Sequence, residues 1–142
     1  MLKFLSPVHK ASRQITVYFE NNMAELEVSP QEGHVLSYLR TYAPCPISEL
    51  ARVFGLKGST LTSMLDRLEE RDLVARQANP ADRRSFVIEL SARGRRLADR
   101  IQCHVEELEN QIGGRVSAKE LKGFRAVMSA IEEATRVNLR ER

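Results

Sequence analysis

The sequence predicts a mainly α-helical protein with one small β-hairpin. Apolar residues recur every three or four positions over most of the 142 residues, which is the spacing of one helix face. Only between residues 73 and 90 does the spacing change to two, as short strands require. A chain of this length with 42% hydrophobic residues can form one compact unit, with or without an added assembly element.

The composition disfavours several classes of protein. The N-terminus lacks the apolar stretch of a signal peptide and no apolar run could span a membrane, so we expect a cytoplasmic protein without membrane contact. Cys45 and Cys103 are too few for a disulfide framework. With no Trp and 6% aromatic residues, a stacking surface for single-stranded nucleic acid is not expected.

Two amphipathic helices are predicted at the N-terminal end. The first covers residues 5–27, and the second begins after Ser29, which can cap it together with Glu32. Pro30 stands at the first helical position, where its missing N–H costs nothing, and the run Pro44-Cys45-Pro46 ends the helix. The apolar face of the first helix contains Leu5, Val8, Ala11, Ile15, Phe19, Met23 and Leu26.

The middle of the chain is predicted to hold two short helices followed by the hairpin. The helices cover residues 47–53 and 58–71 and are separated by Gly55. Two strands follow within residues 73–90, joined by a polar loop over residues 78–85 that contains an Asn-Pro turn signal.

The helical spacing returns after Ser91, with helices expected over residues 93–113 and 117–138. The predicted domain organisation has an N-terminal dimerisation helix, a central unit and C-terminal dimerisation helices, over residues 1–28, 29–91 and 92–142. A core built from the central unit alone cannot cover the apolar faces of both ends. We therefore expect the ends to pack on each other and on a second copy, with a closed monomeric bundle as the alternative.

Residues 47–68 meet the requirements of a helix-turn-helix. Ala51 is the small residue needed where the helices cross, Gly55 tolerates a positive φ in the turn, and Leu61 can pack back on the first helix. The outer face of the second helix is polar and suits base edges and phosphates in a major groove, although an ordinary pair of surface helices is the alternative. The candidate DNA contacts are Lys57, Ser59, Thr60, Thr62, Ser63 and Arg67.

The predicted hairpin has a basic tip that contains Arg83 and Arg84. Residues 71–100 hold eight arginines and four acidic residues, and the resulting charge of +4 exceeds the +3 of the whole chain. Arginines on such a tip can enter the narrow minor groove beside the recognition helix. We expect Asp82 to orient a neighbouring guanidinium through a bidentate pair, or to stabilise the turn with it.

The segments 29–39, 47–74 and 82–91 resemble the MarR (multiple antibiotic resistance regulator) family. The most specific match is Asp82-Arg83-Arg84 followed by an alternating strand that ends in Leu-Ser. The resemblance covers essentially the whole chain. It implies a homodimeric winged helix-turn-helix that binds pseudo-palindromic duplex DNA.

The resemblance also implies what individual parts do. It places the recognition helix at residues 58–71 and the wing at 74–90, with Arg84 as the foremost minor-groove residue. Family members mostly repress transcription and release DNA when a small aromatic or phenolic ligand binds between the dimerisation and DNA-binding parts. The chain departs from the family pattern at Lys57, where a capping Ser or Thr is frequent, and at Asp72, where Gly is frequent.

A ligand cleft and a thiol switch are further candidates. His34 could line a cleft with Tyr18, Tyr38 or Tyr42, and the alternative is an ordinary surface or half-buried imidazole. Cys45 between two prolines could instead make the regulator redox-responsive, provided that its thiol is exposed and near a cation.

Other functions find less support. No catalytic or cofactor-binding motif is present, so we expect neither an enzyme nor a cofactor. Cys103 and His104 are adjacent on a predicted helix and point in different directions, so we expect no metal site. The remaining alternative is a winged helix whose arginines grip an acidic protein partner, which the salt dependence of binding and competition by duplex DNA would distinguish.

Overall fold

The computed structural model describes residues 1–139 and is mainly α-helical, as predicted. Two serine caps form as expected: Ser29 and Glu32 make a capping box, and Ser117 and Glu120 make another. The elements in chain order are α1 (Leu5–Asn22), a 3₁₀ helix (Ala24–Leu26), α2 (Pro30–Tyr42), β1 (Cys45–Pro46), α3 (Ile47–Phe54), α4 (Gly58–Glu70), β2 (Val74–Asn79), β3 (Asp82–Leu90), α5 (Ala92–Gly113) and α6 (Ala118–Thr135).

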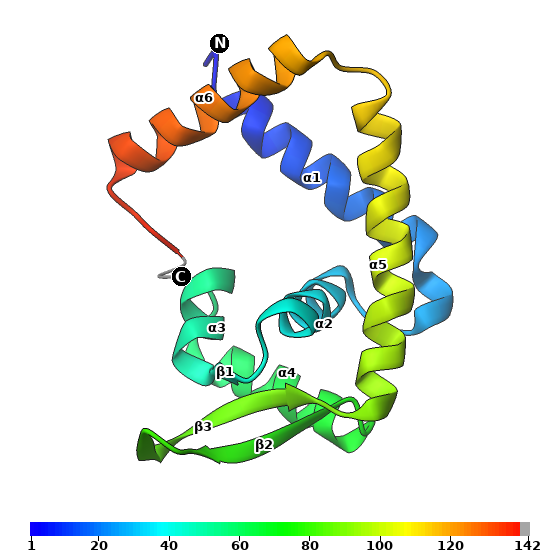
Figure 1. The fold of residues 1–142 in the computed structure, drawn as a ribbon, viewed down its shortest axis with the longest axis vertical. Coiled ribbons are helices and arrows are strands. Elements are labelled where there is room, and N and C mark those ends of the chain that lie inside the picture. The colour runs from blue at the N-terminus through cyan, green and yellow to red at the C-terminus, as the bar shows by residue number, and fades with distance from the viewer. Residues whose placement is uncertain (140–142) are drawn as a thin grey trace.

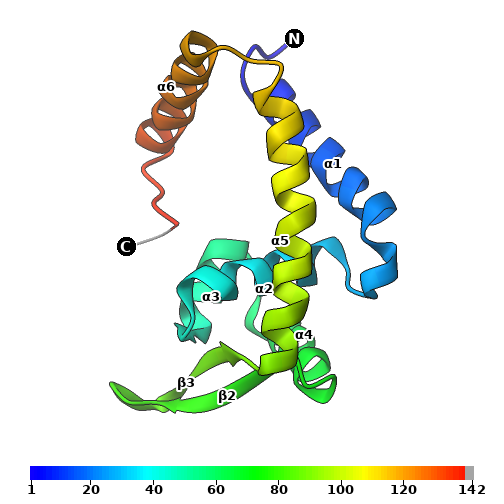
Figure 2. The same cartoon turned by 45° about the vertical axis from the view of Figure 1, so that its right-hand side comes forward.

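The long helix α5 connects two layers of the molecule. Its N-terminal end lies beside α2 and the end of β3, in the layer that also contains α3 and α4. Its C-terminal end reaches the layer that contains α1 and α6 (Figures 1 and 2). The N-terminus lies in that second layer, whereas the chain after α6 returns towards α3 (Figure 1). No helix within residues 1–139 is both long enough and apolar enough to cross a membrane.

Two predicted helix ends are corrected. The first helix ends at Asn22 and not at residue 27, because Met23 leaves the helical path and a short 3₁₀ helix follows. The last helix ends at Thr135 and not at residue 138, because Arg136 takes a left-handed conformation with φ 58°. Residues 140–142 of the predicted C-terminal segment lie outside the described residues.

The sheet has three strands in the order β1-β3-β2, all antiparallel, where the sequence predicted two. The missed strand β1 is only two residues long and pairs Cys45 with Ile88 and Pro46 with Val87. So short a strand has no periodicity of its own. It exists because β3, more than 40 residues later, supplies its hydrogen-bonding edge.

The core lies in the layer of α2, α3, α4 and the sheet. Leu61, predicted to pack back on the first helix of the helix-turn-helix, has no exposed surface, and neither have Leu50, Leu65 and Leu68. Val35, Leu36 and Leu39 of α2, Ile88 of β3 and Ala98 and Ile101 of α5 complete the same cluster. Burial of this kind contributes about 1.5 to 3 kcal/mol for each large aliphatic side chain.

The start of α5 packs directly on Leu73, in the turn that follows α4. The Ser91 N–H donates to the Leu73 carbonyl at 3.1 Å, and the Ser91 hydroxyl caps α5 by accepting from the Gly94 N–H at 2.9 Å. A Cβ at Gly94 would lie 1.8 Å from the Leu73 carbonyl oxygen. Only glycine therefore permits this approach of the two backbones.

Candidate nucleic-acid interface

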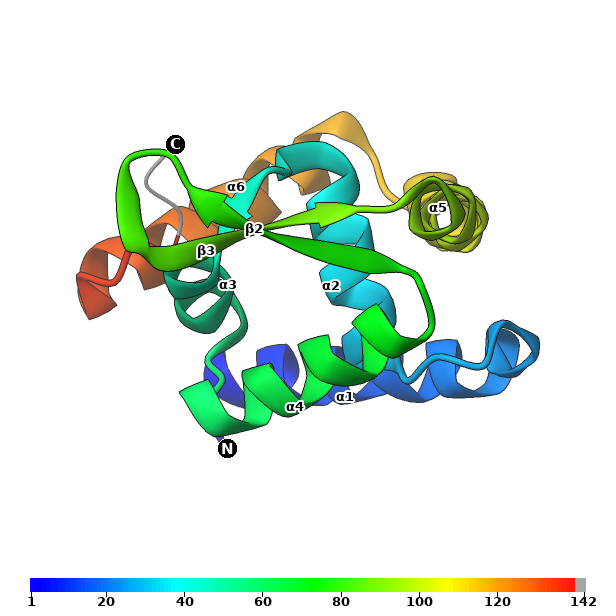
Figure 3. The same cartoon turned by 90° about the horizontal axis from the view of Figure 1, so that it is seen from below.

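Helix α4 presents a polar face to solvent next to the hairpin. Its apolar residues, among them Leu61 and Leu65, point into the core, so that the intervening positions face outward. Seen from below, α4 and the β2–β3 hairpin lie nearest the viewer, with α1 and α6 behind them (Figure 3). All six predicted contact residues of this region are exposed: Lys57, Ser59, Thr60, Thr62, Ser63 and Arg67.

The tip of the hairpin contains a bulge that carries two arginines. Ala78 pairs with Phe86 and Asn79 pairs with Asp82, so residues 83–85 have no partner on β2. The predicted loop over residues 78–85 is therefore wrong, because the connection is only Pro80-Ala81 and β3 already begins at Asp82. The bulge still places Arg83 and Arg84 at the tip, and both are exposed.

Asp82 stabilises this bulge in a way that differs from the predicted guanidinium pair. Its Oδ1 accepts a hydrogen bond from the backbone N–H of Arg84 at 3.0 Å, and no ion pair formed by residues 1–139 involves it. A short Asp side chain satisfies a backbone donor two residues later more easily than it reaches a mobile guanidinium. The Arg84 side chain is thus oriented through its backbone.

Arg76 on β2 connects the hairpin to α4. Its guanidinium contacts Asp66 through Nη2 and lies 3.1 Å from Glu69 through Nε, and its side chain is only 24% exposed. Asp66 lies on the exposed face of α4, three and four positions after Ser63 and Thr62. Arg76 therefore holds the hairpin against α4 and neutralises acidic groups on the face that a phosphate backbone would approach.

We expect Arg76→Gln to weaken duplex binding about ten-fold, because Asp66 and Glu69 would then repel the phosphates. Stability should change by no more than about 1 kcal/mol, since these ion pairs are partly exposed and screened. Fluorescence anisotropy with a labelled duplex measures the first effect and urea unfolding the second. Adding Asp66→Asn and Glu69→Gln should recover most of the affinity; no recovery would contradict the repulsion.

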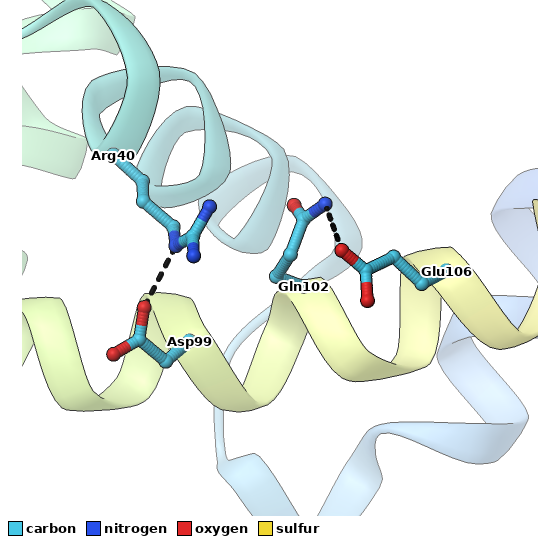
Figure 4. A network of polar contacts seen from close by, with 4 residues as sticks. All are labelled: Arg40, Asp99, Gln102 and Glu106. Atoms are coloured by element: carbon cyan, nitrogen blue, oxygen red, sulfur yellow. Dashed lines mark hydrogen bonds and ion pairs between the residues drawn. The ribbon is translucent and has the colours of Figure 1, made fainter.

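A polar contact also joins α5 to α2. The Arg40 Nε donates to Asp99 Oδ1 at 2.7 Å, while one turn further along α5 Gln102 Nε2 donates to Glu106 Oε1 at 3.0 Å (Figure 4). The hydrogen bond to Asp99 raises the pKa of Arg40, which therefore stays charged. This contact ties the C-terminal end of α2 to α5 (Figure 4).

A cavity of about 600 Å³ lies where α1, α2, α3 and α5 meet. His34 lines it, as predicted, and its ring packs edge-to-face on Phe54 with the ring centroids 4.8 Å apart. Partial removal of water from around the imidazole by the surrounding protein lowers the pKa of His34, although the residue remains exposed to solvent. The lining residues are Ile15, Thr16, Phe19, Met23, Pro30, Gln31, Gly33, His34, Ser37, Val53, Phe54, Ile101 and Val105.

The three tyrosines predicted to share this cleft do not line it. The Tyr38 hydroxyl donates to Glu49 Oε2 at 2.8 Å, which turns the ring into the core against Tyr42 and Phe54. Tyr18 packs edge-to-face on Phe19, and of the two only Phe19 lines the cavity. Of the four residues predicted to line the cleft, only His34 of α2 does so.

Cys45 lies in an environment that does not suit a redox switch. Its side chain has no exposed surface, and its thiol donates to Glu49 Oε2 at 2.8 Å. A reactive thiol needs access and a neighbouring cation, whereas Cys45 faces a carboxylate. The redox-responsive alternative is therefore not supported at this residue. Within the described range no three His, Cys, Asp or Glu side chains converge as a metal site would require.

Comparisons with known proteins agree with this geometry. A sequence model of the MarR family matches residues 28–86, which contain the helix-turn-helix and most of the hairpin. The HTH-type transcriptional regulator PecS of Dickeya dadantii is 34% identical over 115 residues, which cover 78% of this chain and 68% of PecS. The chain belongs to the MarR family. It is accordingly a DNA-binding transcription regulator and not an enzyme.

Further relatives and solved structures match the chain at lower identity. The HTH-type transcriptional repressor NicR of Pseudomonas putida is 25% identical over 113 residues, covering 80% of this chain and 72% of NicR. The S. aureus MepR–DNA complex superposes with a TM-score of 0.82 at 18% identity, over 95% of this chain and 99% of MepR. Wild-type MarR from E. coli, in the apo form, gives a TM-score of 0.76 at 21% identity, over 92% and 98% of the two chains.

The two departures from the MarR pattern are accommodated locally. Asp72 takes a left-handed conformation with φ 55°, which Asp tolerates better than most residues, so the turn after α4 is kept. Lys57 stands at the N-cap of α4 without a side-chain capping hydrogen bond. The helix thereby lacks about 1 kcal/mol of the stabilisation that a Ser or Thr cap supplies, and it gains a positive charge at its exposed end.

The sequence did not single out Arg76 or most of the residues that line the cavity. Arg76 sits in the period-2 segment as an ordinary strand residue, and no local signal pairs it with Asp66 and Glu69. Phe19 is on the predicted apolar face of the first helix, and Ile101 lies within the helix predicted over residues 93–113. The cavity between these helices depends on the angles at which α1, α2, α3 and α5 cross, which local sequence patterns do not determine.

Proposed function

We propose that this chain is a homodimeric repressor that binds a pseudo-palindromic operator and releases it when a small aromatic ligand binds. The observation that carries DNA recognition is the exposed polar face of α4, the helix that Arg76 ties to the hairpin, together with the exposed bulge that carries Arg83 and Arg84. The α4 face enters the major groove and the bulge enters the flanking minor groove. Lys57, Ser59, Thr60, Thr62, Ser63 and Arg67 contact bases and phosphates.

Exposed apolar surface on the terminal helices supports the homodimer. Leu5 and Ile15 of α1 are 50% and 44% exposed, and Leu121 and Phe124 of α6 are 39% and 59% exposed. Neither α1 nor α6 contains a buried residue. Exposed apolar side chains of this kind on the two terminal helices are expected to be covered by a second copy. The two recognition helices then lie roughly 34 Å apart, one duplex turn.

Ligand release works through the cavity between the two layers. Its lining combines residues of α1 and α5 with residues of α2 and α3, so an occupant touches both the dimerisation helices and the helix-turn-helix. Filling it changes the angle between these parts and so the spacing of the two recognition helices, as a rigid-body switch.

Selection of bound fragments from random duplexes tests the proposal. We expect an inverted repeat whose half-sites are centred about one helical turn apart, bound by a dimer. Repeating the selection in the presence of small phenols should reduce recovery. A purified protein that stays monomeric at micromolar concentration, or that ignores every duplex at low salt, would contradict the proposal. Binding to an acidic protein that duplex DNA does not displace would favour the protein-interaction alternative.

A further inference from the structure

The cavity is apolar over most of its lining and holds little polar chemistry. Ile15 and Phe19 of α1, Val53 and Phe54 of α3, and Ile101 of α5 contribute hydrophobic walls. Its volume of about 600 Å³ is within the range of small-molecule sites. The polar groups on the lining are the side chains of Thr16, Gln31, His34 and Ser37, none of which is a fixed cation.

The charge of His34 decides how the cavity receives an anion. Among the lining residues of the described chain, His34 is the only titratable group, and crowding lowers its pKa below the usual value. The imidazole is therefore uncharged near neutral pH. A carboxylate that enters loses its hydration without gaining an ion pair, which costs far more than the transfer of an uncharged group.

The N-terminus of α2 borders the cavity through Pro30 and Gln31, and it is already capped. The Glu32 N–H donates to the Ser29 hydroxyl at 3.1 Å, and Glu32 Oε1 accepts from the Ser29 N–H at 3.1 Å. This capping box places a carboxylate on the helix end, so the positive end of the helix dipole is compensated. The helix end therefore offers little compensation to a ligand anion.

The aromatic residues favour a flat ring with one polar group. The rings of His34 and Phe54 meet edge-to-face with their centroids 4.8 Å apart, and Phe19 of α1 also lines the cavity. Such rings stack or form edge contacts with an aromatic ligand. A neutral imidazole offers one donor and one acceptor, which match a single hydroxyl or carbonyl group.

We infer that this cavity takes an uncharged aromatic molecule with a hydroxyl or carbonyl group and discriminates against aromatic carboxylates. The inference rests on the proposed ligand site and specifies its chemistry. A cavity that binds a carboxylate needs a cation to compensate the buried charge. This chain provides none on the described lining.

The test compares two ligands of the same shape that differ in charge. 3-Hydroxyacetophenone and 3-hydroxybenzoate share the ring and the hydroxyl, and a methyl group in the first replaces a charged oxygen in the second. Isothermal calorimetry on the full chain at about pH 7 should give the ketone at least about ten-fold tighter binding. Equal or tighter binding of the carboxylate would overturn the inference, and so would binding of neither compound.

Variants locate the binding and separate it from the DNA function. His34→Leu should weaken the ketone about three- to ten-fold through the lost hydrogen bond. Tyr18→Phe removes a hydroxyl from α1 outside the lining and should leave the affinity within about two-fold. An unchanged ketone affinity in His34→Leu would overturn the assignment of the polar contact. Operator affinity is measured separately, on ligand-free protein. A failure of DNA binding would refute the proposed function, whereas the ligand affinities would still test this inference.

Discussion

Replacing Gly94 with alanine is expected to destabilise the protein more than the same replacement at any other glycine of the described residues. The new Cβ would lie 1.8 Å from the Leu73 carbonyl oxygen and 2.8 Å from its carbon, and both are backbone atoms that cannot rotate away. Helix α5 must then move off the end of α4, and the hydrogen bonds of Ser91 are strained. We expect a loss of roughly 3 kcal/mol or more.

Thermal unfolding at a fixed protein concentration measures this loss, which corresponds to a fall in Tm of about 10 °C for a chain of this size. Gly113→Ala is the matched control, because it makes the same change at the other end of α5, where an added Cβ meets nothing within 4 Å. The control should be neutral or slightly stabilising, by up to about 1 kcal/mol. Equal Tm values for the two variants would show that the α4–α5 contact tolerates a side chain.

Arg84→Ala is expected to have the largest effect on duplex binding. Arg84 lies in the bulge at the hairpin tip, its backbone is fixed by Asp82, and its side chain is exposed. Loss of an arginine that enters the minor groove should cost about 1 to 3 kcal/mol of binding free energy. The slope of log affinity against log salt should fall by about one unit if the guanidinium also neutralises a phosphate.

Titrations of one duplex across a series of salt concentrations provide both quantities. Arg115→Ala removes the same charge at the far end of α5, where its guanidinium donates to the Gln111 carbonyl at 2.9 Å. This control should keep the affinity within about two-fold. Arg115 follows α5, whose 22 residues place its C-terminal end about 33 Å from its start beside β3, more than three Debye lengths. An Arg84 variant that binds like the control would refute the wing assignment.

The features that the sequence predicted well are those set by neighbours in the chain. Ser29 with Glu32 and Ser117 with Glu120 are three residues apart, so the capping boxes could be seen directly. Gly55 takes φ 62° at the end of α3, as the helix-turn-helix requires. The six helices follow from apolar spacing, and only their ends shifted by a few residues.

The features that escaped prediction depend on distant partners. Strand β1 forms on β3, and the register that makes residues 83–85 a bulge is set by Ala78 pairing with Phe86. His34 and Tyr38 are one turn apart on α2, yet one lines the cavity and the other bonds Glu49 of α3. Local periodicity cannot separate two such positions, because the choice between them is made by another helix.

The close contact at Gly94 has a mechanical consequence. Ile101 and Val105 of the cavity wall lie seven and eleven residues further along α5, about 10 and 16 Å from Gly94. α5 thus acts as a lever arm whose fulcrum is the Leu73 carbonyl, with no flexible side chain in between to absorb motion. A tilt of α5 caused at Ile101 and Val105 therefore rotates the turn after α4. The size of that rotation depends on the distance along α5 and on how rigid the contact between Gly94 and Leu73 is.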